Sequence, residues 1–387
     1  MTSARKRFDA AILVGRFQPF HNAHAALLRA ALASAGRVVV ALGSAFSARN
    51  IRNPFTAEER ATMIRASLDD HAAGRVSFVF VRDYYDDHRW AKAVENGVRA
   101  EMERQGLRAS RAALAGFHKD ATSDYLRLFP QWSRLALERQ GNIDASAIRQ
   151  TYFTNAADSS WTALVPPAVA HFLKDVATRA DFVDIQEEYR AALVYREKWG
   201  EGPFVTLDAV VTAAGHVALV RRKNAPGRGL WAIPGGFLEG RERLFQGAVR
   251  ELKEETGLDM PEADFIDALR DVAVFDHPDR SARGRILTHA HWFDLPLAAL
   301  PAIHGADDAA EARWFPTASL PAMETALFED HFHILDHFLR LLSRDGDQES
   351  GDSASLRHSP ERSDADRATS KCAPYDGCAI ENAKATE

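Results

Sequence analysis

The sequence predicts an α/β chain of two domains, a doubly wound parallel sheet followed by an α+β domain. Three observations lead to this fold class. Strand-like and helix-like periods alternate through the first part of the chain, which is typical of a parallel sheet covered by helices. From residue 203 on, two β-rich runs follow each other directly, as in a hairpin. The length of 387 residues is enough for two or three domains rather than one.

The first domain is expected over residues 1–185. Its elements are a strand in AAILVG, a helix in HAALLRAALASAG, a strand in RVVVALG, a helix in TAEERATMIRASL, a strand in VSFVFV and a final helix in AVAHFLKDVATRA. Thr56 and Glu59 have the spacing of a capping box, which favours a helix start at Thr56. The apolar run near the N-terminus is too short for a signal peptide and is interrupted by Arg16, so we interpret it as the first strand.

The second domain is predicted over residues 203–343, after a linker at 186–202. Its first two strands lie in FVTLDAVVTAAGHVALVRR, where Ala-Ala-Gly makes the turn. A helix follows from about Arg243 to Thr256, then strands in VAVF and ILTHAHWFDL, and a last helix near 324–342. Residues 344–387 are polar and charged, with almost no large apolar side chains, so we expect a disordered tail.

Charge and cysteine usage exclude several classes of protein. Lys and Arg number 48 and Asp and Glu 54, which gives a net charge of −6 and no overall attraction to nucleic acid or an anionic membrane. No apolar run approaches the about 18 residues of a membrane span, and the mean hydropathy is −0.28. The only cysteines, Cys372 and Cys378, lie in the predicted tail and form no disulfide framework. We therefore expect a cytoplasmic protein with neither nucleic-acid nor membrane partners.

The first motif, GRFQPFHNAHAALL, joins the first strand to the following helix. Gly15 and Arg16 follow the carboxyl end of the strand, where open α/β sheets bind ligands. His21 and His24 begin the helix, where free N–H groups and the helix dipole favour a phosphate. Two imidazoles three residues apart share one helix face and can donate hydrogen bonds to one polyphosphate. A transition-metal pair or two surface histidines are the alternatives when this spacing is taken alone.

Residues 15–21 together with His24 resemble the signature of the nucleotidylyltransferases, and more narrowly the archaeal-type nicotinamide-mononucleotide adenylyltransferases. The resemblance continues in NIRNPFTAEER, RDYYDDHRW, GFHKDATSDYLRLFPQW and IDASAIRQ, and it covers most of residues 10–175. It implies a Rossmann-like domain that transfers AMP from ATP to nicotinamide mononucleotide, giving NAD and pyrophosphate. Because the 5′-phosphate attacks the α-phosphorus directly, the protein mainly positions both substrates and stabilises charge on the leaving pyrophosphate.

The same resemblance implies catalytic roles for His21, His24 and Arg149. It implies substrate-binding roles for five further residues, namely Gly15, Arg16, Arg52, Trp90 and Ser146. The two histidines and Arg16 would hold the ATP phosphates. Arg52 and Arg149 match further phosphate-binding positions, and Arg149 stands at the β/γ end beside Ser146. Trp90 matches an aromatic residue near the nicotinamide, where stacking on a cationic ring is apt. An ordinary core tryptophan is the alternative for Trp90.

Two departures from the family pattern bear on ATP binding. Ala23 stands where the family usually has glycine, which tightens the approach of the backbone to the adenine side. Asp144 replaces the usual serine and places a carboxylate close to the expected phosphates. Unless Asp144 points away or meets a magnesium ion, its repulsion would weaken ATP binding. The departures keep open a first domain that serves another mononucleotide or only binds a ligand.

The second motif, GGFLEGRERLFQGAVRELKEETGL, fills every defining position of the Nudix box, which it resembles. On a helix, Glu251, Glu254 and Glu255 are spaced i, i+3 and i+4, so their carboxylates converge on one face. Like charges at this spacing repel, and a merely solvated acidic face is the alternative use for them. We expect Glu242 and Arg250 to pair and to fix the preceding loop against the helix.

The Nudix resemblance implies a divalent cation, Mg²⁺ with Mn²⁺ as the alternative, that clamps a diphosphate and activates water. Glu251 and Glu255 are the first candidates for metal ligands and for catalysis, with Glu254 as the third ligand. Residues 275–293 resemble Nudix domains that are fused to adenylyltransferases and the ADP-ribose-responsive regulators of NAD metabolism. This resemblance favours ADP-ribose as the substrate, although the proline that many ADP-ribose pyrophosphatases carry beyond their box is missing from DVAVF.

Further Nudix residues are less firmly indicated by the sequence. Arg280, Arg283 and Arg285 form a cluster suited to a phosphate or a terminal ribose, although loop arginines are often only solvated. The catalytic base is expected in the acidic loop at 307–311, which offers Asp307, Asp308 and Glu311. The sequence does not choose among these three carboxylates.

The leading hypothesis is a bifunctional enzyme whose partners are ATP, nicotinamide mononucleotide and ADP-ribose, with homo-oligomerisation left open. Its second domain would hydrolyse ADP-ribose to AMP and ribose 5-phosphate. A rival hypothesis makes that domain a sensor that binds ADP-ribose without cleaving it. Sensors of this kind can lose carboxylates of the box and carry a winged helix, whereas this chain keeps all three glutamates and shows no DNA-reading element.

Overall fold

The computed structural model describes residues 7–108, 111–116, 127–136, 143–155 and 158–342. Residues up to Leu342 belong to one unit, so the contacts between its two sheets are part of the fold. The predicted tail at 344–387, with both cysteines, lies outside the described residues, as does the stretch 117–126 of the fourth segment that resembles the adenylyltransferases.

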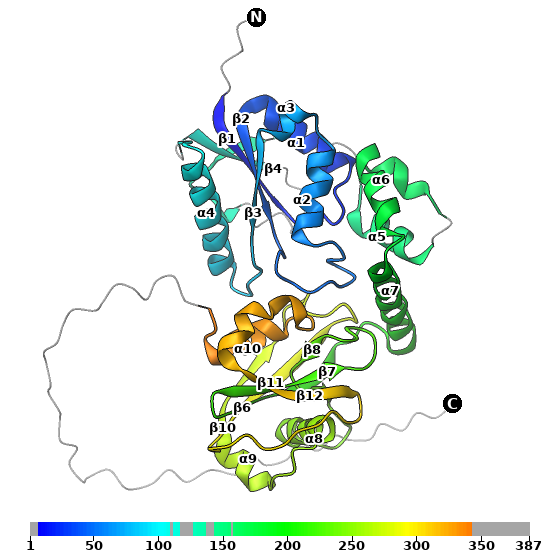
Figure 1. Ribbon diagram of the computed structural model, residues 1–387, viewed down its shortest axis with the longest axis vertical. Coiled ribbons are helices and arrows are strands. Elements are labelled where there is room, and N and C mark those ends of the chain that lie inside the picture. The colour runs from blue at the N-terminus through cyan, green and yellow to red at the C-terminus, as the bar shows by residue number, and fades with distance from the viewer. Residues whose placement is uncertain (1–6, 109–110, 117–126, 137–142, 156–157, 343–387) are drawn as a thin grey trace, which may run out of the picture. The chain divides into compact units, whose positions relative to one another are not determined.

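The first domain contains a parallel sheet with the strand order β3-β2-β1-β4-β5 (Figure 1). Its elements are β1 (Phe8–Gly15), α1 (Asn22–Ser34), β2 (Ala35–Leu42), α2 (Ala57–Ala66), α3 (Asp70–Ala73), β3 (Val76–Phe80), α4 (Asp87–Arg104), β4 (Ala112–Gly116), β5 (Ser133–Ala136), α5 (Ala145–Thr154), a 3₁₀ turn (Ser160–Leu164), α6 (Pro167–Val176) and α7 (Ala180–Trp199). This arrangement confirms the predicted doubly wound domain.

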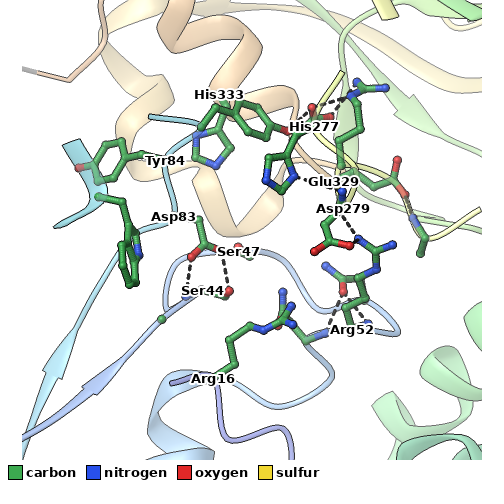
Figure 2. A pocket seen from close by; sticks show the side chains of 18 of the residues that line it. Arg16, Ser44, Ser47, Arg52, Asp83, Tyr84, His277, Asp279, Glu329 and His333 are labelled. Carbon is green, nitrogen blue, oxygen red and sulfur yellow. Dashed lines mark hydrogen bonds and ion pairs between the residues drawn. The ribbon is translucent and has the colours of Figure 1, made fainter. Parts of the chain in front are cut away.

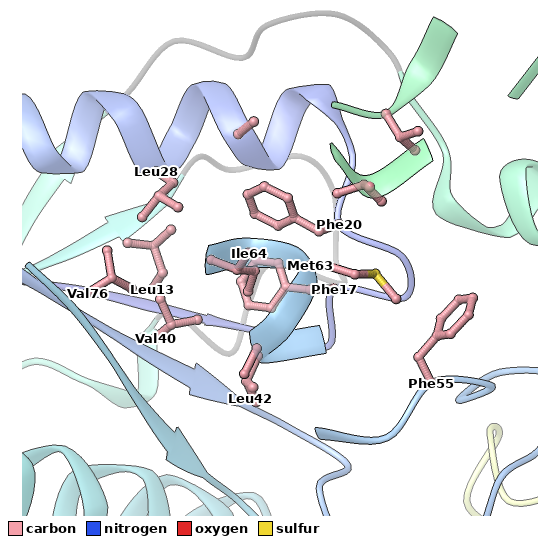
Figure 3. Packing of buried hydrophobic residues seen from close by; sticks show 14 of the residues in the cluster. Leu13, Phe17, Phe20, Leu28, Val40, Leu42, Phe55, Met63, Ile64 and Val76 are labelled. Atoms are coloured by element: carbon pink, nitrogen blue, oxygen red, sulfur yellow. The ribbon is translucent and has the colours of Figure 1, made fainter. Parts of the chain in front are cut away.

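Side chains of each strand point alternately to the two faces of this sheet, and both faces are buried. Ala11 and Leu13 of β1 face the cluster that α1 and α2 complete, shown in Figure 3. Ala10 and Ile12 face the opposite cluster, which α4 covers. The capping box at the start of α2 is confirmed, since the Thr56 hydroxyl accepts from the Glu59 N–H at 3.3 Å and the Glu59 carboxylate accepts from the Thr56 N–H at 2.9 Å.

The second domain contains a mixed sheet of seven strands with the order β10-β11-β6-β7-β12, in which β8 pairs with β7 and β9 with β6. Its elements are β6 (Phe204–Ala213), β7 (His216–Arg222), β8 (Trp231–Ala232), β9 (Gly235–Phe237), α8 (Leu244–Thr256), α9 (Glu262–Ala268), β10 (Leu269–Phe275), β11 (Ile286–Leu295), β12 (Ala309–Pro316), two 3₁₀ turns (Thr317–Ala322 and Glu324–Ala326) and α10 (His331–Leu339). The β6–β7 hairpin is confirmed, and β6 runs parallel to β11.

Two helices sandwich this second sheet. Val210 of β6 packs into the cluster that α10 completes, whereas its neighbours Ala209 and Val211 pack into the cluster formed with α8. Figure 1 shows α10 and α8 on opposite sides of the strands. Residues 186–199 of the predicted linker continue α7, which ends at Trp199, four residues before Pro203. In the described part of the chain, no helix is both long and apolar enough to span a membrane.

The last helix differs from its prediction. It was expected near 324–342, but α10 begins at His331, after a 3₁₀ turn and an extended segment. The Phe328 N–H donates to the Trp231 carbonyl at 2.8 Å, and Leu327 forms a bridge with Trp231. Glu329 then adopts a left-handed conformation with φ 43°. Because residues 327–328 pair with β8 and are not helical, the helix begins only at His331. The turn at 329–330 therefore lies outside the helix.

Candidate active sites

The carboxyl edge of the parallel sheet borders a cavity of about 530 Å³ (Figure 2). The loops after β1 and β2 meet there, as expected for an open α/β sheet. A Cβ on Gly15 would lie 3.1 Å from the buried ring of Phe17, so a side chain at position 15 would press on that ring. Four of the predicted nucleotide-binding residues line this cavity: Gly15, Arg16, Arg52 and Trp90.

A fully buried guanidinium fixes the loops around this cavity. Arg60 of α2 donates hydrogen bonds to the carbonyls of Arg16 at 2.7 Å, Gly43 at 2.7 Å and Ser44 at 3.2 Å. Burial lowers the pKa of Arg60 to about 10, so the group is still charged at neutral pH. One cation therefore ties the ends of β1 and β2 together. The sequence motifs gave no signal for this role.

Asp83 is held in the cavity by a two-pronged contact. The Ser44 backbone N–H donates to one oxygen of its carboxylate at 3.1 Å, and the Ser44 hydroxyl donates to the other at 2.5 Å. Figure 2 shows this pair between Arg16 and Tyr84. The carboxylate is thus oriented by the loop after β2 and is placed to accept hydrogen bonds from a ligand.

The two predicted phosphate-binding histidines stack on each other at the start of α1. Their ring centroids are 3.6 Å apart with an interplanar angle of 19°. Burial and the neighbouring His21 hold the pKa of His24 well below its usual value, so His24 is neutral at pH 7. Its Nδ1 accepts from the His21 N–H at 3.4 Å, which leaves the ring proton on Nε2. His24 is therefore suited to donate a hydrogen bond to a phosphate without carrying charge.

Arg149 and Ser146 lie on α5, close to the loop that carries the histidines. The Arg149 guanidinium donates to the Gln18 carbonyl at 2.6 Å, the Ile51 carbonyl at 3.2 Å and the Ser146 hydroxyl at 3.1 Å. Asp144 caps this helix, because its carboxylate accepts from the Ser146 N–H at 2.9 Å. The departure at position 144 thus has a structural use, as a helix cap.

The predicted residues of the first domain form two groups. The described lining of the 530 Å³ cavity does not include His21, His24, Ser146 or Arg149. These four residues lie together around the segment 18–24 and α5. Trp90 packs edge-on against Phe129 at 5.8 Å between ring centroids and also lines the cavity, so it is both part of the core and part of the cavity wall. Arg52 has Asp279 as an ion-pair partner at 3.0 Å.

In the second domain, glycines let the loop of the Nudix-like motif approach α8. A Cβ on Gly236 would lie 2.4 Å from the Glu251 carboxylate, and one on Gly247 would lie 2.6 Å from the Glu242 carboxylate. The predicted pairing of Glu242 with Arg250 is confirmed, with N–O distances of 3.0 and 2.8 Å. This contact lowers the pKa of Glu242 and fixes the loop on the helix.

The three acidic residues of α8 are not equivalent. Glu255 is 7% exposed and accepts from the Gly235 N–H at 2.9 Å. Burial raises its pKa to about 8, and the nearby Glu251 carboxylate adds to this rise. Burial also raises the pKa of Glu251. Glu254 is instead half exposed and pairs with Arg250 at 2.9 Å. Within the described ranges no three acidic, histidine or cysteine side chains converge as a metal cluster, so the predicted trio is not drawn together.

Glu255 borders a small cavity of about 40 Å³, and several of the other residues in its wall were not predicted from the sequence. These are Asp208 of β6, Arg222 of β7, Glu329 from the turn before α10 and His331, the first residue of α10. The His331 Nδ1 accepts from the Ile233 N–H at 2.8 Å, and burial lowers the pKa of His331. Three separate segments supply these four residues, so no local spacing could have revealed them.

Part of the arginine cluster lines the small cavity, and the acidic loop does not belong to its described lining. Arg280 and Arg283 line the small cavity, whereas Arg285 does not belong to its described lining and contacts Asp276. Arg280 is buried in a two-pronged ion pair with Asp330, at 2.9 and 3.0 Å. The acidic loop at 307–311 is likewise missing from the described lining, and its Glu311 pairs with Arg313.

Each of the two domains of this chain is similar to known proteins. Residues 12–150 match the cytidylyltransferase-like family and residues 203–338 match the NUDIX domain family. The nicotinamide/nicotinic acid mononucleotide adenylyltransferase of Acinetobacter baylyi is 37% identical over 186 residues, which are 48% of this chain and 95% of that protein. The ADP-ribose pyrophosphatase of Methanocaldococcus jannaschii is 34% identical over 138 residues, which are 36% of this chain and 74% of that protein.

A solved structure matches both domains together. The crystal structure of a bifunctional NMN adenylyltransferase/ADP ribose pyrophosphatase from Francisella tularensis, complexed with AMP and a manganese ion, is 31% identical in sequence to this chain. The match covers 86% of this chain and 99% of that chain, with a TM-score of 0.79. The similarity therefore extends across the boundary between the two domains.

Proposed function

The chain belongs to the family of bifunctional nicotinamide-mononucleotide adenylyltransferases/ADP-ribose pyrophosphatases, and from this membership we propose that it carries out both reactions. The first domain transfers AMP from ATP to nicotinamide mononucleotide, and the second hydrolyses ADP-ribose to AMP and ribose 5-phosphate. The observation that carries the proposal is the presence in one chain of a cavity at the carboxyl edge of a parallel sheet and a buried Glu255 on the Nudix helix. We place these reactions in the cytoplasm.

In adenylyl transfer, an oxygen of the mononucleotide 5′-phosphate attacks the α-phosphorus of ATP, and the bond to pyrophosphate breaks. Arg16 and Arg52 supply positive charge inside the cavity where the phosphates would meet. The Nε2–H of His24 donates to a phosphate oxygen of ATP, with His21 beside it. Catalysis rests on position and on charge stabilisation, because no covalent intermediate with the protein is needed.

The Nudix site fits a divalent cation in its donor chemistry. Glu251 and Glu255 are two carboxylates in partly or fully buried surroundings, and burial raises the cost of ionising each, with Glu251 adding to the cost for Glu255. A hard cation such as Mg²⁺ removes that cost and takes oxygen ligands. We propose Glu251 and Glu255 as its protein ligands, with Glu254 further out. When bound, the cation supplies charge neutralisation for the diphosphate and a more acidic water.

The remaining residues of the small cavity suit the diphosphate and the attacking water. Arg222 and Arg283 provide positive charge for the diphosphate oxygens. We propose Glu329 as the general base, in place of the acidic loop at 307–311. Its carboxylate accepts from the Ser281 hydroxyl at 2.9 Å and the Ala282 N–H at 3.0 Å, which orient it beside the cavity.

Two incubations of the purified full-length protein test the proposal. ATP, nicotinamide mononucleotide and Mg²⁺ should yield NAD and pyrophosphate. ADP-ribose and Mg²⁺ should yield AMP and ribose 5-phosphate, with both mixtures analysed by chromatography. NAD formation without cleavage of ADP-ribose would favour the sensor hypothesis for the second domain. Cleavage without NAD formation would favour a first domain that acts on another mononucleotide.

A further inference from the structure

The cavity at the edge of the parallel sheet has a wall made by the second domain. Besides residues of the first domain, its lining includes His277, Asp279, Glu329 and His333. His277 and Asp279 lie in the loop between β10 and β11, and His333 lies in the first turn of α10. Figure 2 shows the two histidines next to each other, across the cavity from Arg16. The substrate space of the first domain is therefore closed by side chains of the second.

Charged contacts hold this wall against the first domain. Arg82 pairs with Glu324, and Arg89 pairs with Asp336 at 3.0 Å. Arg52 donates to the backbone carbonyls of Asp279 and Ser281, besides its ion pair with the Asp279 side chain. The segment 82–90 was singled out by its resemblance to adenylyltransferases, yet two of its arginines bind the second domain. The contacts of segment 82–90 explain how loops that are distant in the chain keep fixed positions around one cavity.

Tyr85, from the same segment, packs against both His277 and His333. Its ring centroid lies 5.2 Å from that of His277 and 5.3 Å from that of His333. Its hydroxyl donates to the Asp330 carboxylate, which is also held by Arg280. The tyrosine thus sets the positions of both imidazoles relative to the sheet. Packing of this kind orients the rings before any ligand arrives.

We propose that His277 and His333 of the second domain bind the nucleoside part of the mononucleotide in the adenylyl-transfer reaction, an inference that rests on the proposed function. Different residues of the cavity suit the phosphate and the pyridinium ring of the mononucleotide. Arg16 and Arg52 suit the phosphate of the mononucleotide, and Trp90 suits its pyridinium ring. The ribose hydroxyls and the carboxamide remain, and they need groups that donate and accept hydrogen bonds without competing for the phosphate.

The two imidazoles supply such groups. The His277 Nδ1 accepts from the Asp279 N–H at 3.1 Å, which leaves its Nε2–H to donate. Burial lowers the pKa of His333, so this ring is neutral at pH 7, with one nitrogen to donate and the other to accept. A neutral ring adds no charge beside the cationic pyridinium. The oriented carboxylate of Asp83 lies on the opposite wall and can accept from the same hydroxyls. A mononucleotide seated between these walls would contact both domains at once.

The test compares Michaelis constants in the full-length protein. His277→Ala, His333→Ala and the double variant should each raise KM for nicotinamide mononucleotide by about threefold to tenfold per lost hydrogen bond, with KM for ATP unchanged. His333→Gln should recover part of the loss, because its amide can also donate and accept. His337→Ala is the matched control, since His337 lies four residues further along α10, is exposed and does not line the cavity.

An unchanged KM for the mononucleotide in the double variant would overturn the inference, as would equal rises for both substrates. Thermal melting of each variant separates loss of binding from loss of fold. If the unaltered protein forms no NAD, the proposed function itself fails. Calorimetric titration with nicotinamide mononucleotide alone then decides the inference: weaker binding by the double variant supports it, and equal or absent binding overturns it.

Discussion

The backbone N–H of Gly235 donates a hydrogen bond of 2.9 Å to the carboxylate of Glu255. This bond is too little to stabilise a buried negative charge, since burial still raises the Glu255 pKa to about 8. The neighbouring Glu251 and Asp208 carboxylates increase the cost further. A carboxylate that is so costly to ionise gains stability when a cation binds to it.

Glu255→Gln should lower metal-dependent hydrolysis of ADP-ribose by at least about 100-fold, because the amide cannot replace a buried anionic ligand. Adenylyl transfer should stay unchanged. Glu254→Gln is the matched control on the same helix, and its half-exposed side chain predicts less than about a tenfold loss. Steady-state rates with ADP-ribose and Mg²⁺ measure both. Equal losses in the two variants would contradict the assignment, because Glu254 would then matter as much as Glu255.

Cation binding to the Nudix site should tighten as the pH rises. Below pH 8 an increasing share of Glu255 is protonated and must release a proton before it can bind a metal ion. We expect affinity for Mg²⁺ to increase between pH 6 and 8 by up to about tenfold per unit. Calorimetry in buffers of different ionisation enthalpy measures the released proton. A flat profile for the unaltered protein, identical to that of Glu255→Gln, would contradict this assignment.

The same raised pKa predicts how stability changes with pH when no metal is present. The folded-state pKa of Glu255, about 8, exceeds its ordinary value of 4.5, so the folded protein holds the extra proton between these two values. The contribution of Glu255 to stability is therefore lost as the pH rises through this window. Melting temperatures in a chelating buffer should show the unaltered protein falling relative to Glu255→Gln from pH 5 to 8. A constant difference would refute the shift.

Asp144→Ser should lower KM for ATP by about twofold to fivefold, the range expected for one exposed charge. Serine is also a good helix cap, so the melting temperature should hardly change. Asp144→Ala is the comparison, because it removes the same charge and also the cap, at a cost of about 1 kcal/mol. If neither variant alters KM for ATP, the Asp144 carboxylate does not reach the phosphates.

Asp330→Asn should destabilise the protein by about 3–5 kcal/mol, because it leaves the buried Arg280 without its counter-charge. Removing both charges with Arg280→Met and Asp330→Asn should cost less than the single change. Equilibrium unfolding in urea gives both values. A double variant less stable than Asp330→Asn would mean that Arg280 has a second stabilising partner of equal weight.

Much of the fold followed from local patterns. Alternating periods located the parallel sheet, because buried strands such as β1 and β2 carry unbroken apolar runs. The Nudix helix and its Glu242–Arg250 pair were predicted because all their determinants lie within 24 residues of sequence. The late start of α10 was missed, since the pairing of Phe328 with Trp231 joins residues almost a hundred positions apart.

The sites were predicted less completely for the same reason. Motifs located Gly15, Arg16 and Glu255, which occupy fixed places in their own segments. Glu329 and His333 belong to a segment whose pattern only indicated a helix. Their places in the cavity wall depend on the packing of the two domains against each other, and no residue spacing within either domain predicts that packing. The ion pair of Arg280 with Asp330 could not be predicted either, because it spans 50 positions.

Arg60 has a consequence for the energetics of ligand capture. Its three hydrogen bonds to loop carbonyls are made entirely within the protein. The loops after β1 and β2 are thus preorganised, and a nucleotide that binds there loses little of its affinity to the ordering of the backbone. The buried amides of these loops should resist hydrogen exchange even in the ligand-free enzyme. Selectivity among nucleotides then depends on groups around this rigid frame, and they can change without rebuilding it.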